Sequence, residues 1–248
     1  MIILKSSHEL ARMREAGRIV AAVLARLREK VAPGVTTAEL DALAYQIIVG
    51  YGARPSFKGY RGFPASLCVS VNEEVVHGIP GKRILQEGDI VSLDVGSIYR
   101  GYQGDAAITL GVGKVNGTAQ HLMEVAAEAL QAGIAQSRAG KRSGDISWAI
   151  QKCAERNGYA VVREYTGHGI GRDMHEEPQI PNFGEPGRGV LLKPGMTFAL
   201  EPMVTVGDYR TRVLDDNWTV VTLDGLLSAH FEHTVAVTEG EPKILTRL

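Results

Sequence analysis

The sequence predicts an α/β fold in which two similar αβ halves pack around a central antiparallel sheet. Three observations support this prediction: a pair of helix patterns in each half, short apolar runs typical of strands, and a residue pattern that occurs twice along the chain. No linker of low complexity separates the halves. We therefore expect residues 1–248 to form a single domain, with halves that span roughly 1–115 and 116–248.

Each half opens with two predicted helices. Ser6 with Glu9 forms a capping box, in which a side chain at each position satisfies a free backbone N–H group of the helix start. Apolar residues then recur at helical spacing. The four predicted helices run from Ser6 to Pro33, from Thr36 to about Gly50, from about Thr118 to Gln136, and from Ser143 to Asn157.

Short apolar runs that are typical of β-strands lie between and after these helices. The chain contains 29 glycines and 10 prolines, which separate the runs by tight turns. The predicted strands are Leu67–Val71, Ile90–Val95, Ala106–Leu110, Thr197–Leu200, Trp218–Leu223 and His230–Val237.

The same residue pattern occurs twice along the chain. Residues 33–43 match residues 139–149 at an offset of 106, and residues 85–94 match residues 192–201 at an offset of 107. Each half therefore places one acidic residue, Asp94 or Glu201, at the end of an apolar strand. Chance repetition of helix–turn–strand patterns is the alternative explanation. We prefer two halves related by a pseudo-two-fold axis, with a shared site where the acids meet.

Composition excludes several classes of protein. The chain is 44% hydrophobic and 22% charged with a formal net charge of −1, which is typical of a folded protein and gives no reason to expect nucleic-acid specificity. Two cysteines suit a reducing compartment. We find no secretory signal and no run of about 18 apolar residues, so we expect a cytoplasmic protein without a membrane segment.

Acidic residues inside apolar strands are the strongest sign of chemistry. They are Asp94, Asp105, Glu201 and Glu232. A buried carboxylate without a partner costs several kcal/mol, so each of the four needs a proton, a donor network or a cation. One such acid would usually be explained by a salt bridge. Four acids at matching places in two halves favour a metal site.

His168, which lies between Gly167 and Gly169, is the natural fifth ligand. Two divalent ions would balance the charge of the four carboxylates. Oxygen donors with one imidazole and no thiolate favour Mn, Fe or Co, and Zn remains open. Two such ions would lower the pKa of a water molecule toward neutrality. His233 is expected to be structural, because strand geometry turns it away from Glu232.

Six motifs occur in order along the chain. They are residues 70–80, 89–96, 104–105, 166–178, 195–202 and 231–234. Over essentially the whole chain they resemble the type I methionine aminopeptidases of the short bacterial kind. This resemblance implies the pita-bread fold, and it implies hydrolysis of the peptide bond after an N-terminal Met when the next residue is small.

The resemblance also implies residue roles. The five implied ligands of two divalent ions are Asp94, Asp105, His168, Glu201 and Glu232. Asp105 and Glu232 would bridge the ions, and Glu201 would also accept a proton from the attacking water. His175 would contact the scissile carbonyl, and His77 would contact the scissile amide nitrogen.

The implied substrate-binding residues are His77, His175, Phe57, Tyr60, Phe63, Cys68, Met174 and Trp218. Phe57, Phe63 and Met174 stand where the family pattern has a cysteine, a tyrosine and a phenylalanine. All three remain apolar, and an aromatic and sulfur-lined pocket still suits a flexible thioether. A plain core position is the alternative for each aromatic residue, including Trp218.

Two other functions remain as alternatives. An X-Pro aminopeptidase or prolidase would share the fold, although such enzymes usually carry an additional N-terminal domain. A non-catalytic pita-bread binding module would have lost ligands, whereas all five are present.

The resemblance further implies partners. The substrate would be the N-terminal Met of nascent polypeptides, with transient ribosome association, and the chain would act as a monomer. A monovalent cation beside the Asn72 and Ser228 loops is an additional expectation. The sequence does not determine the identity of the divalent metal.

Overall fold

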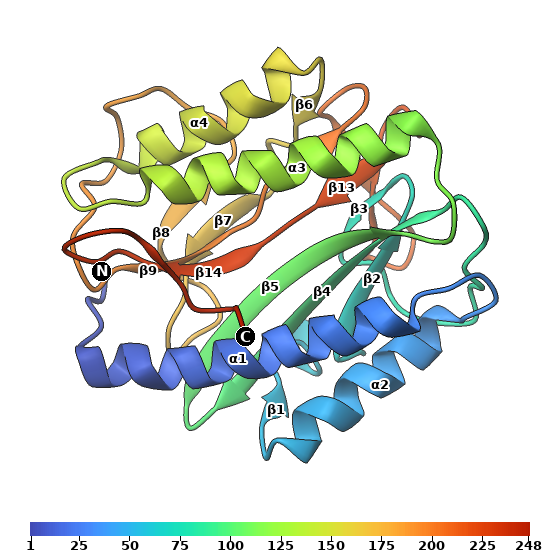
Figure 1. Ribbon diagram of the computed structural model, residues 1–248, viewed down its shortest axis with the longest axis horizontal. Coiled ribbons are helices and arrows are strands. Elements are labelled where there is room, and N and C mark those ends of the chain that lie inside the picture. Colours follow the sequence, from blue (N-terminus) through green and yellow to red (C-terminus); the bar gives the residue numbers. More distant parts are fainter.

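Four α-helices and fifteen β-strands make up the chain, and the computed structural model describes every residue from 1 to 248 (Figure 1). The helices are α1 (Ser7–Lys30), α2 (Thr37–Gly50), α3 (Gly117–Gln136) and α4 (Ser143–Arg156). The strands are β1 (Arg54–Pro55), β2 (Leu67–Val71), β3 (Glu74–Val76), β4 (Ile90–Tyr99), β5 (Tyr102–Gly111), β6 (Ala160–Val161), β7 (Thr166–Gly169), β8 (Glu176–Pro181), β9 (Thr197–Leu200), β10 (Met203–Thr205), β11 (Thr211–Val213), β12 (Val220–Thr222), β13 (Ser228–His230), β14 (His233–Ala236) and β15 (Lys243–Ile244). No helix has the length and apolar character needed to cross a bilayer.

All four predicted helices are confirmed. The Ser6 hydroxyl accepts a hydrogen bond from the Glu9 N–H at 3.3 Å, and the Glu9 carboxylate accepts one from the Ser6 N–H at 2.9 Å. Thr36 and Glu39 repeat this capping box at the start of α2. The helix boundaries follow from local chemistry, which is why the sequence alone could locate them.

Four strand predictions are wrong in extent. Two are too short, since β4 extends the run predicted over Ile90–Val95 as far as Tyr99, and β5 extends the run predicted over Ala106–Leu110 to Tyr102–Gly111. The run predicted over Trp218–Leu223 shortens to β12, because Trp218 and Thr219 bond the Asp216 carboxylate instead of a neighbouring strand. The run predicted over His230–Val237 divides into β13 and β14. Glu232 lies in the link between them, and Glu201 lies just after β9 rather than inside a strand.

Two antiparallel sheets form the centre of the molecule. In the first, β4 pairs with β1 and β2 along one edge and with β5 along the other. The second has the order β15-β14-β9-β7-β8. Two three-stranded sheets, β13-β10-β6 and β11-β12-β3, complete the fold.

A seam of hydrogen bonds joins the two central sheets between β5 and the β13–β14 segment. Ala107 and Glu232 exchange backbone hydrogen bonds, with the Glu232 N–H donating at 2.9 Å. On one side of this pair, the Thr109 hydroxyl accepts from the His230 N–H and donates to the His230 carbonyl, both at 2.8 Å. On the other side, the Thr234 hydroxyl makes the matching pair of bonds to the backbone of Asp105. The seam makes one continuous antiparallel surface from the two sheets.

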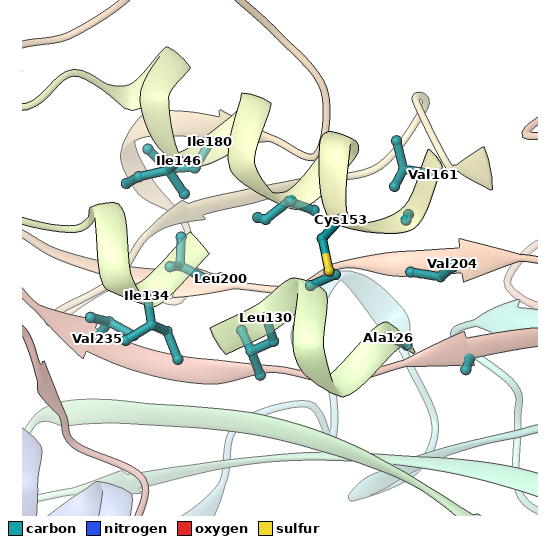
Figure 2. Packing of buried hydrophobic residues seen from close by; sticks show 14 of the residues in the cluster. Ala126, Leu130, Ile134, Ile146, Cys153, Val161, Ile180, Leu200, Val204 and Val235 are labelled. Atoms are coloured by element: carbon teal, nitrogen blue, oxygen red, sulfur yellow. The ribbon is translucent and has the colours of Figure 1, made fainter. Parts of the chain in front are cut away.

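Helices cover one face of this surface. α1 and α2 cover the part that contains β4 and β5, and α3 and α4 cover the part that contains β9 and β14 (Figure 1). Figure 2 shows the hydrophobic core beneath α3 and α4, where Leu130 and Ile134 of α3 lie against residues of the sheet. Leu93 and Val95 of β4 belong to the corresponding core beneath α1 and α2. The helices leave the opposite face of the sheet uncovered.

The repeated sequence pattern corresponds to a repeated structure. The Gly34 N–H donates to the Leu85 carbonyl at 2.8 Å, and the Gly140 N–H donates to the Leu192 carbonyl at 3.0 Å. Isolated bridges Thr36–Ile84 and Arg142–Leu191 follow the same correspondence. The predicted α/β fold with two similar halves around an antiparallel sheet is therefore confirmed.

Gly104 permits the close approach of α1 to β5. A Cβ atom at this position would lie 2.7 Å from the Gly17 nitrogen and 2.8 Å from the Ala16 carbonyl carbon. These are backbone atoms of a packed helix, so they cannot move aside as a flexible side chain would. Gly104 also precedes Asp105 directly, so the packing of α1 fixes the strand that carries this carboxylate.

We expect Gly104→Ala to lower the free energy of unfolding by about 2 kcal/mol or more, because the methyl group forces α1 away from β5. Gly50→Ala is the matched control, since nothing lies within 4 Å of its added Cβ. The control should stay within about 1 kcal/mol of wild type. Urea unfolding measures both variants, and equal stabilities for the two would contradict the close-packing explanation.

Candidate active site

The candidate acids lie on the face of the sheet that the helices leave uncovered. Leu93 and Val95 pack under α1 and α2, so strand alternation turns Asp94 to the opposite face. Ala106 packs with the same core, which turns its neighbour Asp105 away from the helices. We call this uncovered side the site face.

Strand register brings the acids together. Asp94 pairs with Ala107, which in turn pairs with Glu232 across the seam. His233 pairs with Leu200, so continuing this register by one residue places Glu201 opposite Glu232. The small Ala107 side chain therefore lies between two carboxylates, where it leaves room above the sheet.

Asp105 and His168 occupy the next row of the site face. Asp105 pairs with Gly96 on one side and lies next to Thr234 on the other. Ala199 pairs with Thr234 on one side and with His168 on the other, so a second small side chain lies between Thr234 and the His168 imidazole. The two rows enclose one space above the sheet.

This geometry fits a metal centre. Carboxylate oxygens of Asp94, Asp105 and Glu232 lie within 4.8 Å of one another. One oxygen of each of these three groups is buried without any hydrogen-bond partner. Such orphaned acceptors are costly, and hard oxygen donors of this kind suit divalent cations. The chain thus contains a cluster of acidic residues able to bind metal.

His168 presents a free ring nitrogen to this cluster. Its Nδ1 lies 2.8 Å from the Gly169 carbonyl, which can only accept, so Nδ1 carries the proton. The lone pair therefore resides on Nε2, which lies 3.5 Å from the Glu201 carboxylate. Burial lowers the pKa of His168 to about 4, so the ring is neutral near pH 7. A neutral ring oriented by a carbonyl is typical of a metal ligand.

Burial raises the pKa of all four carboxyl groups. The pKa of Asp94 rises to about 7. Burial and the nearby Asp94 carboxylate raise the pKa values of Asp105 and Glu201 well above their usual range. Burial, followed by repulsion from Asp105, does the same to Glu232. Like charges in a dry site disfavour ionisation, so the metal-free cluster holds protons at neutral pH.

The cluster forms the floor of a cavity of about 170 Å³. Every residue that the sequence assigned to the site lines this cavity. The His175 ring lies 4.1 Å from the His168 ring, centre to centre, and the Tyr60 hydroxyl is 2.8 Å from His175 Nδ1. His77 lies edge-on between the rings of Tyr165 and Trp218. Two histidines thus face the space above the acids.

A buried ion pair holds the loop that carries His175. The Glu176 carboxylate pairs with the Lys5 ammonium, and both side chains are almost completely buried. The same carboxylate accepts a hydrogen bond from the Arg172 N–H at 2.9 Å. The N-terminal segment therefore helps to fix the position of the residue beside His175.

The apolar part of the cavity wall is formed by the remaining predicted residues. Phe63 and Cys68 are buried together, and the Trp218 ring meets the Phe63 ring edge-on at 5.1 Å. Met174 is buried in a neighbouring cluster against Phe57. The alternative that Trp218 is a plain core residue does not hold, since its half-buried side chain lines the cavity.

Three cavity residues and the seam were missed by the sequence analysis. Arg61, Tyr165 and Thr166 line the cavity. Arg61 and Tyr165 were signalled only by their closeness in sequence to Tyr60 and His168, and Thr166 begins the motif 166–178 but was assigned no role. Thr109 gave no signal, because threonine is common in strands. Thr234 ends the motif 231–234 but was assigned no role. His233 lies on the helix side and bonds Thr246 at 2.9 Å, which agrees with a structural role.

Comparison with known proteins defines the class of this site. The pattern of metallopeptidase family M24 matches residues 11–239, and the chain belongs to this family. It is therefore a metal-dependent hydrolase with the pita-bread fold, as the sequence analysis expected.

Within the family, the resemblance to methionine aminopeptidases is confirmed. Methionine aminopeptidase 1 of Bacillus subtilis is 53% identical over 100% of both chains. A crystal structure of methionine aminopeptidase from Thermotoga maritima has a TM-score of 0.99 and 47% identity, again covering 100% of both chains. The prolidase from Pyrococcus furiosus has a TM-score of 0.80 at 23% identity and is covered over 66% of its length, a likeness that shows the shared fold.

We expect binding of Mn²⁺ at pH 7 to release roughly one proton or more, because carboxyl groups with raised pKa values must lose protons before they bind a cation. Affinity should therefore increase as the pH rises through 7. His168, already neutral, contributes no proton. Titration calorimetry in PIPES and in Tris measures the released protons through the different ionisation heats of the buffers. Equal heats in both buffers would contradict the raised pKa values.

Proposed function

We propose that this protein removes the N-terminal Met from nascent polypeptides by hydrolysing the first peptide bond when the second residue is small. The observation that carries the proposal is the meeting of an acid-lined floor with an aromatic and sulfur-lined wall in one cavity. A metal-dependent hydrolase needs the first, and a flexible thioether side chain suits the second. Sequence identity of 53% to methionine aminopeptidases, over essentially the full chain, supports this substrate.

The metal centre is proposed to hold two divalent ions, of Mn, Fe, Co or Zn. The proposed ligands are Asp94, Asp105, His168, Glu201 and Glu232. Asp105 and Glu232, whose carboxylates lie within 4.8 Å of each other, are the two residues that would serve both ions, as the resemblance implies. When bound, the ions supply Lewis acidity that lowers the pKa of water beside them.

The remaining steps are assigned to this chain's own side chains. Glu201, at the edge of the cluster, accepts the proton of the attacking water. His175 donates a hydrogen bond to the scissile carbonyl and stabilises the negative charge that develops there, an effect worth several kcal/mol in such sites. His77 contacts the scissile amide nitrogen and assists the departing amine. The wall formed by Phe57, Phe63, Cys68, Met174, Trp218 and Tyr60 holds the Met side chain.

The other proposed properties concern the chain as a whole. Residues 1–248 are proposed to act as one catalytic domain and as a monomer in the cytoplasm, with transient ribosome association. A monovalent cation is proposed beside Asn72 and Ser228, whose backbones are joined by a hydrogen bond of 2.9 Å. The Ser228 hydroxyl is buried without a partner, which supports this placement.

We expect the Mn²⁺-loaded protein to release Met from Met-Ala-Ser and to leave Ala-Pro-Ser intact. The cavity wall suits a thioether, and the chain is 53% identical over its full length to methionine aminopeptidase 1 of Bacillus subtilis. Chromatography of the free amino acids measures the outcome. Hydrolysis of Ala-Pro-Ser without hydrolysis of Met-Ala-Ser would reject the proposed substrate, and no hydrolysis of either peptide would favour a binding module.

We expect His175→Ala to lower kcat by about 10²-fold or more with unchanged metal content, because it removes a donor to the developing oxyanion. Asp105→Ala is the contrasting variant and should lose both metal and turnover, because it removes a buried carboxylate of the cluster. Steady-state kinetics with elemental analysis separates the two effects. Loss of metal in His175→Ala would make this histidine a ligand, and Asp105→Ala activity within tenfold of wild type would reject the bridging role.

A further inference from the structure

Arg61 is the only lysine or arginine among the residues that line the cavity. It is exposed, so its guanidinium lies at the rim rather than on the floor. No hydrogen bond or ion pair neutralises this charge, and its one specific contact is with the face of the Tyr60 ring at 5.4 Å. The positive charge of Arg61 at the entrance of the cavity is therefore free to interact with a bound ligand.

The backbone at Arg61 is held in an unfavourable conformation. Arg61 has φ of 50°, in the left-handed region that residues with a side chain rarely adopt. Gly59 and Gly62 on either side also have positive φ, and the Gly59 N–H donates to the Phe63 carbonyl at 2.8 Å, which closes the turn. Strain of this kind persists where surrounding contacts enforce it, and it concentrates at functional positions.

The guanidinium of Arg61 lies near the residue that we assign to the scissile carbonyl. Tyr60 links Arg61 to His175, since the Tyr60 and His175 rings are stacked with centres 5.5 Å apart. These two successive distances place the guanidinium within about 11 Å of the His175 ring. Consecutive Cα atoms of an extended peptide are about 3.8 Å apart. If His175 contacts the first carbonyl, Arg61 is within reach of the third residue.

We propose that Arg61 determines specificity at the rim by binding a carboxylate of the substrate two residues beyond the scissile bond. This inference rests on the proposed function. Two divalent ions would neutralise the four acids of the floor, which removes the repulsion that a substrate carboxylate would otherwise meet. An aspartate or glutamate side chain at the third position and the free terminus of a tripeptide both supply this chemistry.

Three tripeptides, compared in two pairs, distinguish these sources. Met-Ala-Asp-amide against Met-Ala-Asn-amide varies the side-chain charge alone, and Met-Ala-Asn with a free terminus against its amide varies the terminal charge alone. We expect wild type to favour the charged member of at least one pair by about threefold in kcat/KM, the size of a solvated ion pair. The preference should be expressed in KM, because Arg61 lies away from the reacting bond, and 0.5 M salt should reduce it.

Three variants assign the preference to Arg61. Arg61→Gln should reduce it to less than about 1.5-fold, and Arg61→Lys, which keeps the charge, should retain it. Lys58→Gln is the matched control, because Lys58 is exposed in the same loop and stacks on Tyr45 outside the cavity. Lys58→Gln changes the net charge by the same amount as Arg61→Gln and should retain the preference.

Two kinds of result overturn the inference. The first is a wild-type kcat/KM preference for the charged peptide below about 1.5-fold in both pairs. The second is a preference that does not depend on Arg61, either because Arg61→Gln keeps it or because Lys58→Gln loses as much of it as Arg61→Gln does. Failure of wild type to release Met from Met-Ala-Asn-amide would instead reject the proposed function itself. Thermal unfolding of Arg61→Gln should match wild type, since the side chain makes no hydrogen bond.

Discussion

The seam between β5 and the β13–β14 segment is the constraint on which the site depends. Asp94 and Asp105 lie in one sheet and His168 lies in the other, while Glu201 and Glu232 adjoin the ends of β9 and β14 in that second sheet. Where the two backbones bond directly, Ala107 pairs with Glu232, and threonine hydroxyls make the connections on either side. A hydroxyl can both donate and accept, so it satisfies a carbonyl and an N–H group at once. The two half-sites meet because these bonds join the sheets.

The second constraint is the cost of burying like charges together. Helices remove water from one face of the sheet, while the acids of the other face remain in a space with few donors. Their carboxyl groups respond by holding protons, as the raised pKa of Asp94 illustrates. A cation relieves this cost, so the arrangement is unfavourable for the empty chain and favourable for the loaded protein. Sites of function commonly depart in this way from what is best for stability alone.

Local and periodic features could be predicted from the sequence. The capping boxes at Ser6 and Thr36 located two helix starts, because a cap depends on residues only three apart. The repetition of the residue pattern indicated the two halves, and the structure repeats the corresponding bonds at Gly34 and Gly140. By contrast, the continuous apolar run around Glu232 suggested a single strand. The structure divides it there, because β13 pairs with β10 in one sheet and β14 pairs with β9 in another.

The sequence by itself determined which residue types carry the chemistry: acids inside apolar runs, a histidine between glycines, and aromatic residues before a strand. Only the tertiary structure decided which of them share one cavity, which nitrogen of His168 is free, and that Arg61 stands at the rim. The physical reason is distance along the chain. Burial patterns, periodicity and helix caps depend on residues that are close together in the sequence. The meeting of Asp105 with Glu232 depends instead on hydrogen bonds between segments more than a hundred residues apart.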